Sequence, residues 1–386
     1  MKILRIIASL DPAQGGPVEG LRESAALMAE AGHETEVVTL DDPAAPFLES
    51  IDLPVYGMGP VSRFSLAPRL ALWVAAAARH FDAAIIHGLW NPASIAGWQG
   101  LKRAGLPYVV FTHGMLDSWF AKAYPAKHWA KQIAWLAAQG WVLHDAETVL
   151  FTSDEEQRRA RGAFFGPAYR STVIAYGSAQ PPDFEHRHRE ALAAAIPSLA
   201  DRRYLLFLGR FHEKKGCDLL IEAFARVASQ TPGLDLVIAG PDQVGLRTPL
   251  TDLAMRLGIA NRLHWPGLIE GDAKWGALRC ADALVMPSHQ ENFGIAVAEA
   301  LACGTPVLVS DQVNIWREID AADAGLVAPD TLEGTHRLLT RFLALTPQER
   351  AAMGENARAC HANNFSMPKA AEDLTRILAS ITRPNR

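Results

Sequence analysis

Two glutamates occupy a stretch of sequence that is suited to a phosphorylated sugar. The stretch spans residues 282–310 and reads DALVMPSHQENFGIAVAEALACGTPVLVS. We expect an apolar strand, a polar loop with Glu291, an alanine-rich helix with Glu299 and a second strand, with Gly304 ending the helix. Carboxylates accept hydrogen bonds from sugar and ribose hydroxyls. The pair therefore indicates a sugar-binding loop.

Backbone amides beside this loop supply the matching anion site. The expected helix N-terminus includes Asn292, Phe293, Gly294 and Ile295. The first amides of a helix have no partner inside it, and the helix dipole adds positive charge there, so a phosphate binds well. The alternative is an ordinary strand, loop and helix with a solvated acid, because two glutamates at this spacing often occur by chance.

A second strand, loop and helix carries a basic pair suited to a diphosphate. In RYLLFLGRFHEKKGCDLLIEAFARV, the strand 204–208 leads to Arg210, and Lys215 with Gly216 precedes an amphipathic helix. Arginine offers a planar fork of donors and lysine a point charge, and both neutralise phosphate. Lys214 is the weaker candidate of the two lysines. The alternative is a set of solvated surface charges.

The N-terminal residues predict a βαβ unit with a glycine pair at its first turn. Strands are expected at 2–8 and 34–40, with a helix at about 18–31 between them. The loop holds Gly15 and Gly16 but no GxGxxG, so the fingerprint of a nicotinamide dinucleotide site is absent. Two glycines before a helix let a ligand phosphate approach the backbone, and the alternative is a plain turn.

Two histidines follow the ends of expected strands. Further strands are expected at 83–87, 107–112, 147–151 and 172–175, mostly separated by helical patterns, which favours a parallel sheet. Ligands collect at the carboxyl ends of such strands. His113 is the stronger candidate because a glycine follows it directly after a strand end. His87 is the weaker one and is expected to support the site wall or the acceptor.

The segment 118–144 is rich in tryptophan and lysine and contains no acidic residue. Trp129, Ile133 and Leu136 fit one helical face, with Lys127 and Lys131 nearby. The first interpretation is a core helix with a basic rim. The second is a surface that meets anionic lipid headgroups or a phosphorylated acceptor.

The segment 152–162 opens a further helix. Ser153 or Asp154 can cap it, and Glu156 stands where a capping box places its acid. We interpret the charges of this helix as a cap and a solvated face.

The composition excludes several other classes. With 386 residues the chain has room for two domains, and 49% hydrophobic and 20% charged residues allow large cores. A net charge of −5 argues against a nucleic-acid partner held by bulk charge. The four cysteines form no CxxC pair and indicate small buried side chains in a reducing compartment.

No targeting or spanning segment is evident. The start MKILRIIASLDP is too short and too soon polar for a signal peptide. No apolar run approaches the ~20 residues of a spanning helix. We expect a cytoplasmic protein, with peripheral contact on the inner face of the cell membrane through 118–144 as an option.

The two motifs together resemble a known family. The elements GR-x4-KG (Arg210, Lys215) and E-x7-E with FG after the first acid (Glu291, Glu299) resemble those of retaining glycosyltransferases of family four, of the bacterial polysaccharide type. The resemblance implies the α/β GT-B fold: two facing Rossmann-like domains with a deep cleft between them. It implies an acceptor-side domain at 1–182, to which a last helix at 369–386 returns, and a donor domain at 203–368.

The resemblance also implies roles for single residues. Arg210, Lys215 and amides near Gly16 and Gly294 stabilise the leaving diphosphate. Glu291 and His113 orient the sugar, Glu299 holds the ribose, and backbone near Ile269 meets the nucleobase. The catalytic set is thus expected to be His113, Glu291, Arg210 and Lys215.

The implied reaction moves a hexose from a nucleotide diphosphate sugar to a hydroxyl, with retention at the anomeric carbon. UDP-glucose or a related UDP-hexose is favoured as donor, with GDP-mannose next, and a saccharide or lipid-linked saccharide of surface polysaccharide synthesis as acceptor. No DxD-like acidic pair stands in a suitable loop, so we expect no metal and no cofactor. The alternatives are a nucleotide-sugar epimerase of the same architecture and a non-catalytic nucleotide-sugar-binding protein.

Overall fold

The chain folds into two compact units in a computed structural model that describes residues 1–12, 16–59, 67–199 and 202–382. Unit 1 comprises Met1–Gly177 together with Met367–Arg386, and unit 2 comprises Ser178–Ser366. The last helix, α16 (Met367–Ile381), thus belongs to unit 1. Each unit has its own parallel sheet.

Unit 1 is built on a seven-stranded sheet in the order β3-β2-β1-β4-β5-β6-β7. The strands are β1 (Lys2–Ile6), β2 (Glu34–Thr39), β3 (Val55–Gly57), β4 (Ala83–His87), β5 (Tyr108–Phe111), β6 (Thr148–Phe151) and β7 (Ser171–Val173). The central strand β4 is buried at every position, as a strand covered on both faces must be. This explains why its sequence reads as a continuous apolar run up to His87.

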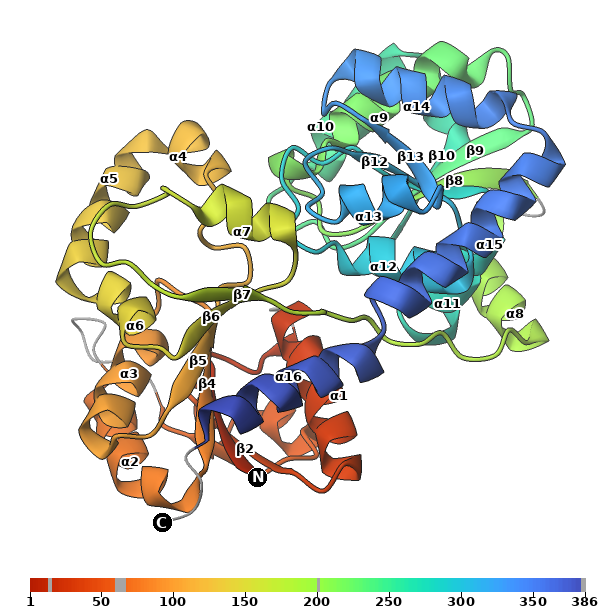
Figure 1. The fold of residues 1–386 in the computed structure, drawn as a ribbon. Helices are drawn as coiled ribbons and strands as arrows, with labels where there is room; N and C mark the ends of the chain where they lie inside the picture. The colour runs from red at the N-terminus through yellow and green to blue at the C-terminus, as the bar shows by residue number, and fades with distance from the viewer. Residues whose placement is uncertain (13–15, 60–66, 200–201, 383–386) are drawn as a thin grey trace. The chain divides into compact units, whose positions relative to one another are not determined.

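Helices cover both faces of that sheet (Figure 1). The α-helices of unit 1 before α16 are α1 (Gly16–Glu30), α2 (Pro68–Ala77), α3 (Pro92–Ala104), α4 (Trp119–Ala123), α5 (Pro125–Ala134), α6 (Gly140–His144) and α7 (Asp154–Ala160). On one face, α2 and α3 pack over a core that includes Ile6, Ile86 and Trp135. On the other, α1 and α16 pack over Ile3 and Ile85, with Leu374 and Leu378 buried.

Unit 2 repeats the plan with a six-stranded sheet in the order β10-β9-β8-β11-β12-β13. The strands are β8 (Arg203–Leu208), β9 (Leu234–Ala239), β10 (Leu263–Gly267), β11 (Ala283–Met286), β12 (Val307–Ser310) and β13 (Gly325–Ala328). The α-helices are α8 (His186–Ala195), α9 (Cys217–Ala228), α10 (Arg247–Arg256), α11 (Gly271–Cys280), α12 (Ile295–Cys303), α13 (Trp316–Ala321), α14 (Leu332–Ala344) and α15 (Pro347–Asn364). Both units are therefore Rossmann-like, as expected.

The segment 118–144 corrects the first interpretation of its helical face. Trp129 is 65% exposed, Ile133 70% and Leu136 45%, so this face is not in the core. Trp135 and Gln139 are buried instead. A π-helical turn at Trp135–Gln139 follows α5 and rotates the later residues relative to a regular helix. The tryptophans thus divide between core and surface.

Two other expectations concern membrane-spanning helices and the cysteines. Among the residues that the structure describes, no helix is both long and apolar enough to cross a membrane. All four cysteines are free thiols, and Cys217, Cys303 and Cys360 are buried, in agreement with their expected role as small core side chains.

Candidate functional site

Lys215 and Glu291 are in contact in unit 2. Lys215 stands at the end of the loop after β8 and Glu291 in the loop after β11, and the lysine ammonium donates to the glutamate carboxylate. Lys215 is 9% exposed. Burial, and then the positive charges of Lys214 and Arg210, lower the pKa of Lys215 to about 7. The touching carboxylate of Glu291 acts against that shift, because it favours the charged ammonium.

The two loops are held together by their backbones. The carbonyl oxygen of Lys214 accepts from the amide of His289 at 2.7 Å, and the Lys214 ammonium donates to the Gln290 amide oxygen at 2.9 Å. Gly216 is left-handed with φ 65°, and a Cβ there would stand 2.4 Å from the carbonyl oxygen of Pro287. Only glycine permits this approach, which explains the residue after Lys215.

Arg210 stands in the same loop as Lys215 and is exposed. Its Nη1 lies 3.5 Å from the Gln243 amide oxygen. Within the described part of unit 2, no carboxylate forms an ion pair with it. Its guanidinium therefore keeps its capacity for a bidentate anion.

Glu299 lies in α12 and is only 7% exposed. Lys274 in α11 donates to its carboxylate at 2.7 Å. This pairing with Lys274 was not predicted from the sequence. The segment GDAKWG offers no motif for it, because the pairing joins two helices that are separate in sequence.

The loop before α12 differs from the expected anion cradle. The helix begins at Ile295, with Gly294 left-handed at φ 75° as its N-cap. Asn292 and Phe293 therefore precede the first helical turn, whose free amides start at Ile295. The Phe293 side chain is buried, and its ring packs edge-on against that of Phe365, with 5.6 Å between the ring centroids. Its side chain anchors the loop, so only its backbone is left for a ligand.

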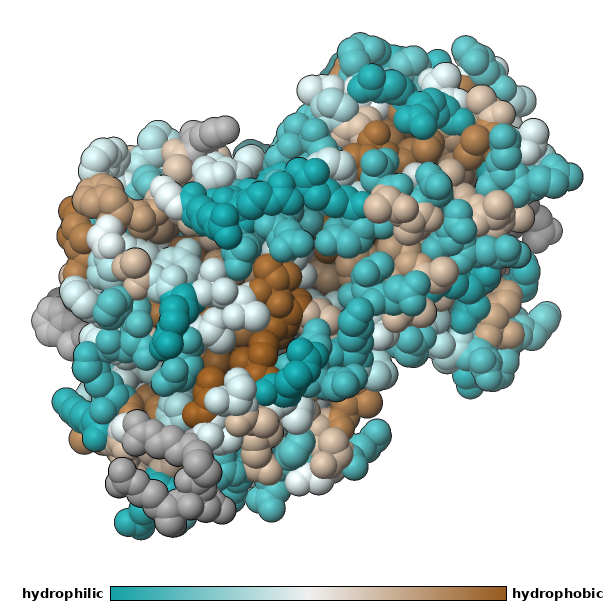
Figure 2. Space-filling model, in the orientation of Figure 1, coloured by the Kyte–Doolittle hydropathy of each residue, from teal (hydrophilic) through white to brown (hydrophobic). Residues whose placement is uncertain are grey.

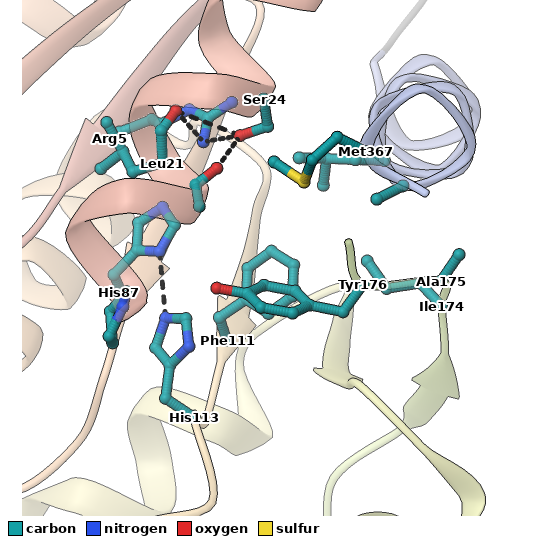
Figure 3. A pocket seen from close by; sticks show the side chains of 14 residues that line it. Arg5, Leu21, Ser24, His87, Phe111, His113, Ile174, Ala175, Tyr176 and Met367 are labelled. Carbon is teal, nitrogen blue, oxygen red and sulfur yellow. Dashed lines mark hydrogen bonds between the residues drawn. The ribbon is translucent and has the colours of Figure 1, made fainter. Parts of the chain in front are cut away.

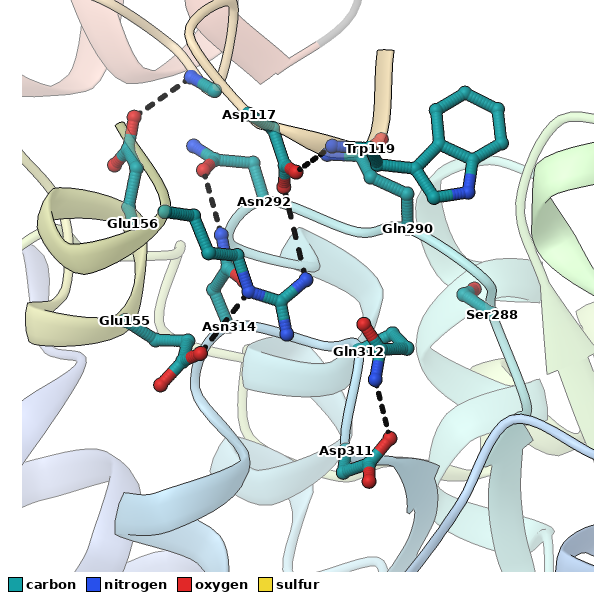
Figure 4. A network of polar contacts seen from close by, with 12 residues as sticks. Asp117, Trp119, Glu155, Glu156, Ser288, Gln290, Asn292, Asp311, Gln312 and Asn314 are labelled. Carbon is teal, nitrogen blue, oxygen red and sulfur yellow. Dashed lines mark hydrogen bonds and ion pairs between the residues drawn. The ribbon is translucent and has the colours of Figure 1, made fainter. Parts of the chain in front are cut away.

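Polar contacts fix the same loop from the side of β12. The side-chain amide of Asn314 donates to the Asn292 amide oxygen at 3.2 Å, and that of Gln312 donates to Asp311 at 2.6 Å (Figure 4). The backbone of Glu291 also bonds to residues after β12: its amide donates to the carbonyl oxygen of Gln312 at 3.1 Å. Glu291 thus sits on a braced loop.

The remaining predicted donor residues lie at element ends. Ile269 is 5% exposed, just after β10, and its neighbour Leu268 is 60% exposed. Gly16 is the first residue of α1, and its carbonyl oxygen accepts from the Tyr176 hydroxyl at 3.4 Å. Gly15 lies outside the described residues.

His113 and His87 meet in unit 1 (Figure 3). The Nδ1 atom of His87 lies 3.2 Å from Nε2 of His113. The two rings are stacked, with 5.5 Å between their centroids. Burial lowers the pKa of His113 to about 4. Burial, and then the nearby His113 and Arg5, hold the pKa of His87 well below its ordinary value. Both rings are therefore neutral near pH 7.

A buried carboxylate clamps the His113 loop. Glu156 in α7 is 3% exposed. One of its oxygens accepts from the Thr112 hydroxyl at 2.8 Å and the Gly114 amide at 2.7 Å. The other accepts from the Thr152 amide at 2.8 Å and hydroxyl at 2.7 Å. His113 between them is left-handed with φ 49°, a strained conformation for a histidine, and the clamp opposes its relaxation.

The Glu156 clamp corrects the interpretation of this helix as a cap with a solvated face. Ser153 does cap it, accepting from the Glu156 amide at 3.1 Å. The Glu156 side chain instead turns inward, because four donors of two strand ends meet there. No signal in the sequence of the helix itself marks this role.

The structure thus brings Lys215 and Glu291 together in unit 2 and His87 and His113 together in unit 1. Glu299 is paired with Lys274, and Arg210 is paired with no carboxylate among the residues that the structure describes. Among the described residues, no group of three or more histidine, cysteine, aspartate or glutamate side chains could hold a metal ion.

Two profiles of known protein families match the chain. The profile described as "Glycosyl transferases group 1" matches residues 188–359, and the one described as "Glycosyl transferase 4-like domain" matches residues 15–177. The two matches follow one another and together cover most of the chain. The protein therefore belongs to the group 1 glycosyl transferases and is a glycosyltransferase.

Relatives agree over nearly the full length. A D-inositol 3-phosphate glycosyltransferase of Saccharomonospora viridis is 28% identical, covering 93% of this chain and 88% of the relative. The one of Nocardiopsis dassonvillei is also 28% identical, covering 94% and 89%.

Solved structures show the fold. Anabaena HepE in complex with UDP and glucose has a TM-score of 0.79 at 21% identity, over 99% of this chain and 100% of that one. Sucrose-phosphate synthase from Thermosynechococcus elongatus has a TM-score of 0.78 at 21% identity, with 99% of both chains covered. The expected GT-B fold is confirmed.

Proposed function

We propose that this glycosyltransferase moves a hexose from a nucleotide diphosphate sugar to an acceptor hydroxyl, with retention at the anomeric carbon. The observation that carries the proposal is the arrangement in unit 2. Lys215 contacts Glu291, and Arg210 is near enough to lower the pKa of that lysine. This arrangement places the cations of Lys214, Lys215 and Arg210 near the Glu291 carboxylate. A diphosphate supplies the missing negative charge.

Binding of the diphosphate should rearrange the Lys215–Glu291 pair. The phosphates take the Lys215 ammonium and the Arg210 guanidinium, which stabilises the charge that develops on the leaving group. Glu291 is then released to accept from sugar hydroxyls. Glu299, oriented by Lys274, holds the ribose hydroxyls, and backbone near Ile269 meets the base.

The chemistry we propose needs no covalent intermediate. The acceptor oxygen attacks the anomeric carbon from the face that the phosphate leaves. The carbon–phosphate-oxygen bond breaks, the new glycosidic bond forms on the same side, and a leaving phosphate oxygen takes the acceptor proton. His113, neutral near pH 7, holds a hydroxyl of the transferred sugar.

We favour a UDP-hexose as donor, with UDP-glucose first and GDP-mannose next. The form ENFG after β11 supports this choice. The solved structure of the similar Anabaena HepE with UDP and glucose supports it too. We further propose that the reaction needs no metal ion, because Arg210 and Lys215 together supply the positive charge that a divalent cation would bring.

The acceptor we propose is a saccharide or a lipid-linked saccharide, presented at a membrane surface. The apolar face of α5 that includes Trp129 and Ile133 is exposed, and Figure 2 shows brown, hydrophobic atoms over this helix at the edge of the molecule. The segment 118–144 has lysines and no acid, which complements anionic headgroups. Since the similar relatives are named for an inositol phosphate, a polysaccharide acceptor has no support from them.

Transfer to water tests the donor half without a known acceptor. The protein is incubated with UDP-glucose in excess EDTA, and the first free glucose is observed by proton NMR before its anomers equilibrate. We expect slow release of UDP and the α anomer first. The β anomer first would contradict retention, and a strict need for Mg²⁺ or Mn²⁺ would contradict metal independence.

The two alternative functions, epimerase and binding protein, give different results in the same assay. An epimerase changes the donor sugar without transfer to water or to any added saccharide. A binding protein leaves the donor intact. Arg210→Ala serves as the control, because hydrolysis by a contaminant survives it.

A further inference from the structure

A pocket in unit 1 has a charge that donor binding does not explain. Its volume is about 220 Å³. Its walls come from the loop after β5, from α5 and from the segment after α7, and include Asp117, Tyr124, Lys127, Lys131 and Phe164. The loop is the one that carries His113, so the pocket begins close to the residue proposed to hold the sugar.

The charge of this pocket is positive. Lys127 and Lys131 stand one turn apart in α5, an arrangement of like charges that weakens a helix. Burial, and then Lys127, lower the pKa of Lys131. The acid in the wall, Asp117, is 6% exposed and already engaged: it accepts from the Trp119 amide at 2.8 Å and pairs with Arg159 at 3.8 Å (Figure 4).

Aromatic rings lie beside both lysines of the pocket. The Lys127 ammonium lies 5.1 Å from the centre of the Tyr124 ring, and the Lys131 ammonium 4.8 Å from that of Trp90. His128 stacks on Phe164 at 4.7 Å. Two ammonium groups held over rings, with flat apolar walls beside them, suit a sugar or polyol ring that carries a phosphate.

We propose that this pocket binds the phosphate of the acceptor, a phosphorylated sugar or polyol that is either free or part of a lipid headgroup. The proposal rests on the proposed transferase function, since only a transferase has an acceptor. In this proposal, the two faces of α5 have different ligands. Lys127 and Lys131 read the phosphate, while the exposed Trp129 and Ile133 are left for the membrane.

Binding of matched probes to the full chain tests this site. Inositol 3-phosphate, inositol and inorganic phosphate are titrated by calorimetry into wild type, Lys127→Gln/Lys131→Gln and the control Arg103→Gln, which removes an exposed cation of α3. We expect inositol 3-phosphate to bind at least about tenfold more tightly than inositol, and the double variant to lose that difference. Lys127→Arg/Lys131→Arg should keep it, which separates lost charge from misfolding.

A vesicle arm distinguishes the source of the phosphate. Phosphatidylcholine vesicles with and without phosphatidylinositol are compared in a flotation assay. Binding of the lipid-borne phosphate, lost in the double Gln variant, assigns the pocket to a lipid headgroup. Equal binding of inositol and its phosphate, together with vesicle binding that survives the double variant, would overturn the proposal. Thermal stabilisation by UDP, measured in parallel, reports on the donor half separately.

A second inference comes from the Arg5–His87–His113 contacts and does not depend on that pocket. Arg5 is 1% exposed, and its Nη1 donates to the Ser24 hydroxyl at 2.8 Å. No carboxylate pairs with it in the described part of the chain. His87 shares a small cavity with Arg5, and its Nε2 atom is buried and has no hydrogen-bond partner among the described residues. Figure 3 shows this nitrogen on the side of the ring that faces Arg5.

The arginine charge selects one arrangement of the ring protons. A proton on Nε2 of His87 would place a buried N–H without an acceptor beside a positive charge, which is unfavourable. A lone pair there is favourable. The geometry therefore points to a His87 that carries its proton on Nδ1 and donates it to Nε2 of His113. His113 then carries its own proton on Nδ1, as a donor for a ligand oxygen, and Arg5 and His87 are positioning residues.

The tautomers are directly observable. Long-range proton–nitrogen correlation spectra of the protein with nitrogen-15 histidine distinguish the two ring nitrogens, and His113→Gln and His87→Gln assign the signals. We expect His113 to be protonated at Nδ1 and His87 likewise. A proton on Nε2 of His113 would overturn the inference. The result does not require turnover, so it stands apart from the proposed function, and Arg5→Lys, which keeps the charge, should preserve the pattern.

Discussion

Glu156 shows how a residue's role can depend on groups that the sequence keeps far apart. Its position after Ser153 predicts a capping acid, and the cap does form. The carboxylate, however, accepts from Thr112 and Gly114, which lie more than forty residues earlier, at 2.8 and 2.7 Å. Periodicity reports a helix face but not which strand end arrives beside it. The histidine pair is the same case: each was identified alone, and their contact was not.

Removal of one Glu156 oxygen should loosen the His113 loop. In Glu156→Gln, an NH₂ group replaces one carboxylate oxygen and faces the two donors from which that oxygen accepted. Two buried hydrogen bonds are therefore lost. We expect about 2 kcal/mol of destabilisation in urea unfolding, and a fall in turnover larger than that in donor affinity. Asp154→Asn, an exposed acid of the same helix, is the control. Unchanged stability in the Glu156 variant would mean that the clamp contributes nothing.

The buried histidines give a pH dependence of stability. The pKa of His113 is lowered from 6.5 to about 4 in the folded protein. As pH falls through that window, the unfolded chain binds protons that the folded chain does not, so stability is lost. Urea midpoints between pH 7 and 4.5 should fall less steeply in His113→Gln than in wild type. The exposed His80→Gln should follow wild type, and equal slopes in all three proteins would contradict the assignment.

At the scale of elements, local patterns predicted the strand, loop and helix around Lys215 and did not show which face of α5 is buried. The glycine of the GR-x4-KG segment, Gly216, is left-handed and passes close to Pro287 in another loop of the unit. Trp129, Ile133 and Leu136 do share one helical face, but that face is exposed, so its assignment to the core was wrong. The buried side chains Trp135 and Gln139 lie in the π-helical turn Trp135–Gln139 instead, and no residue type announces that turn.

Two left-handed glycines allow the cost of backbone strain to be distinguished from the cost of a steric clash. A Cβ at Gly216 would meet the Pro287 carbonyl oxygen at 2.4 Å, whereas one at Gly258 would meet nothing within 4 Å. Gly258→Ala should therefore cost about 1 kcal/mol, from its conformation alone. Gly216→Ala should cost more and weaken UDP-glucose binding, because it displaces Lys215. Equal effects of the two variants on unfolding and on binding would argue against a fitted contact between the loops.

At the scale of the whole molecule, two Rossmann-like units follow from alternating strands and helices, and the strand positions were largely predicted. The edge strands β3 (Val55–Gly57) and β13 (Gly325–Ala328) were not, because each is too short to show a clear apolar pattern. The return of the last helix to unit 1 came from the family resemblance. Leu374 and Leu378 explain it physically, since they fill a core with Ile3 and Ile85.

Removal of that helix should affect the units unequally. Truncation after Ser366 exposes the surface that two buried leucines cover, which destabilises unit 1 by about 3 kcal/mol or more. Unit 2 keeps all of its own strands. Calorimetric unfolding should show one transition shifted down and one retained with its stabilisation by UDP. Loss of both transitions together would show that the units do not unfold separately.

The central claim is that Arg210 and Lys215 bind the diphosphate of a nucleotide sugar without a metal ion. Isothermal titration of UDP-glucose, with GDP-mannose in parallel, in excess EDTA tests it most directly. We predict binding at one site to wild type and to Arg256→Ala, an exposed arginine of unit 2, and at least about tenfold weaker binding to Arg210→Ala. Equal affinity of all three proteins, or binding only after Mg²⁺ is added, would contradict the account.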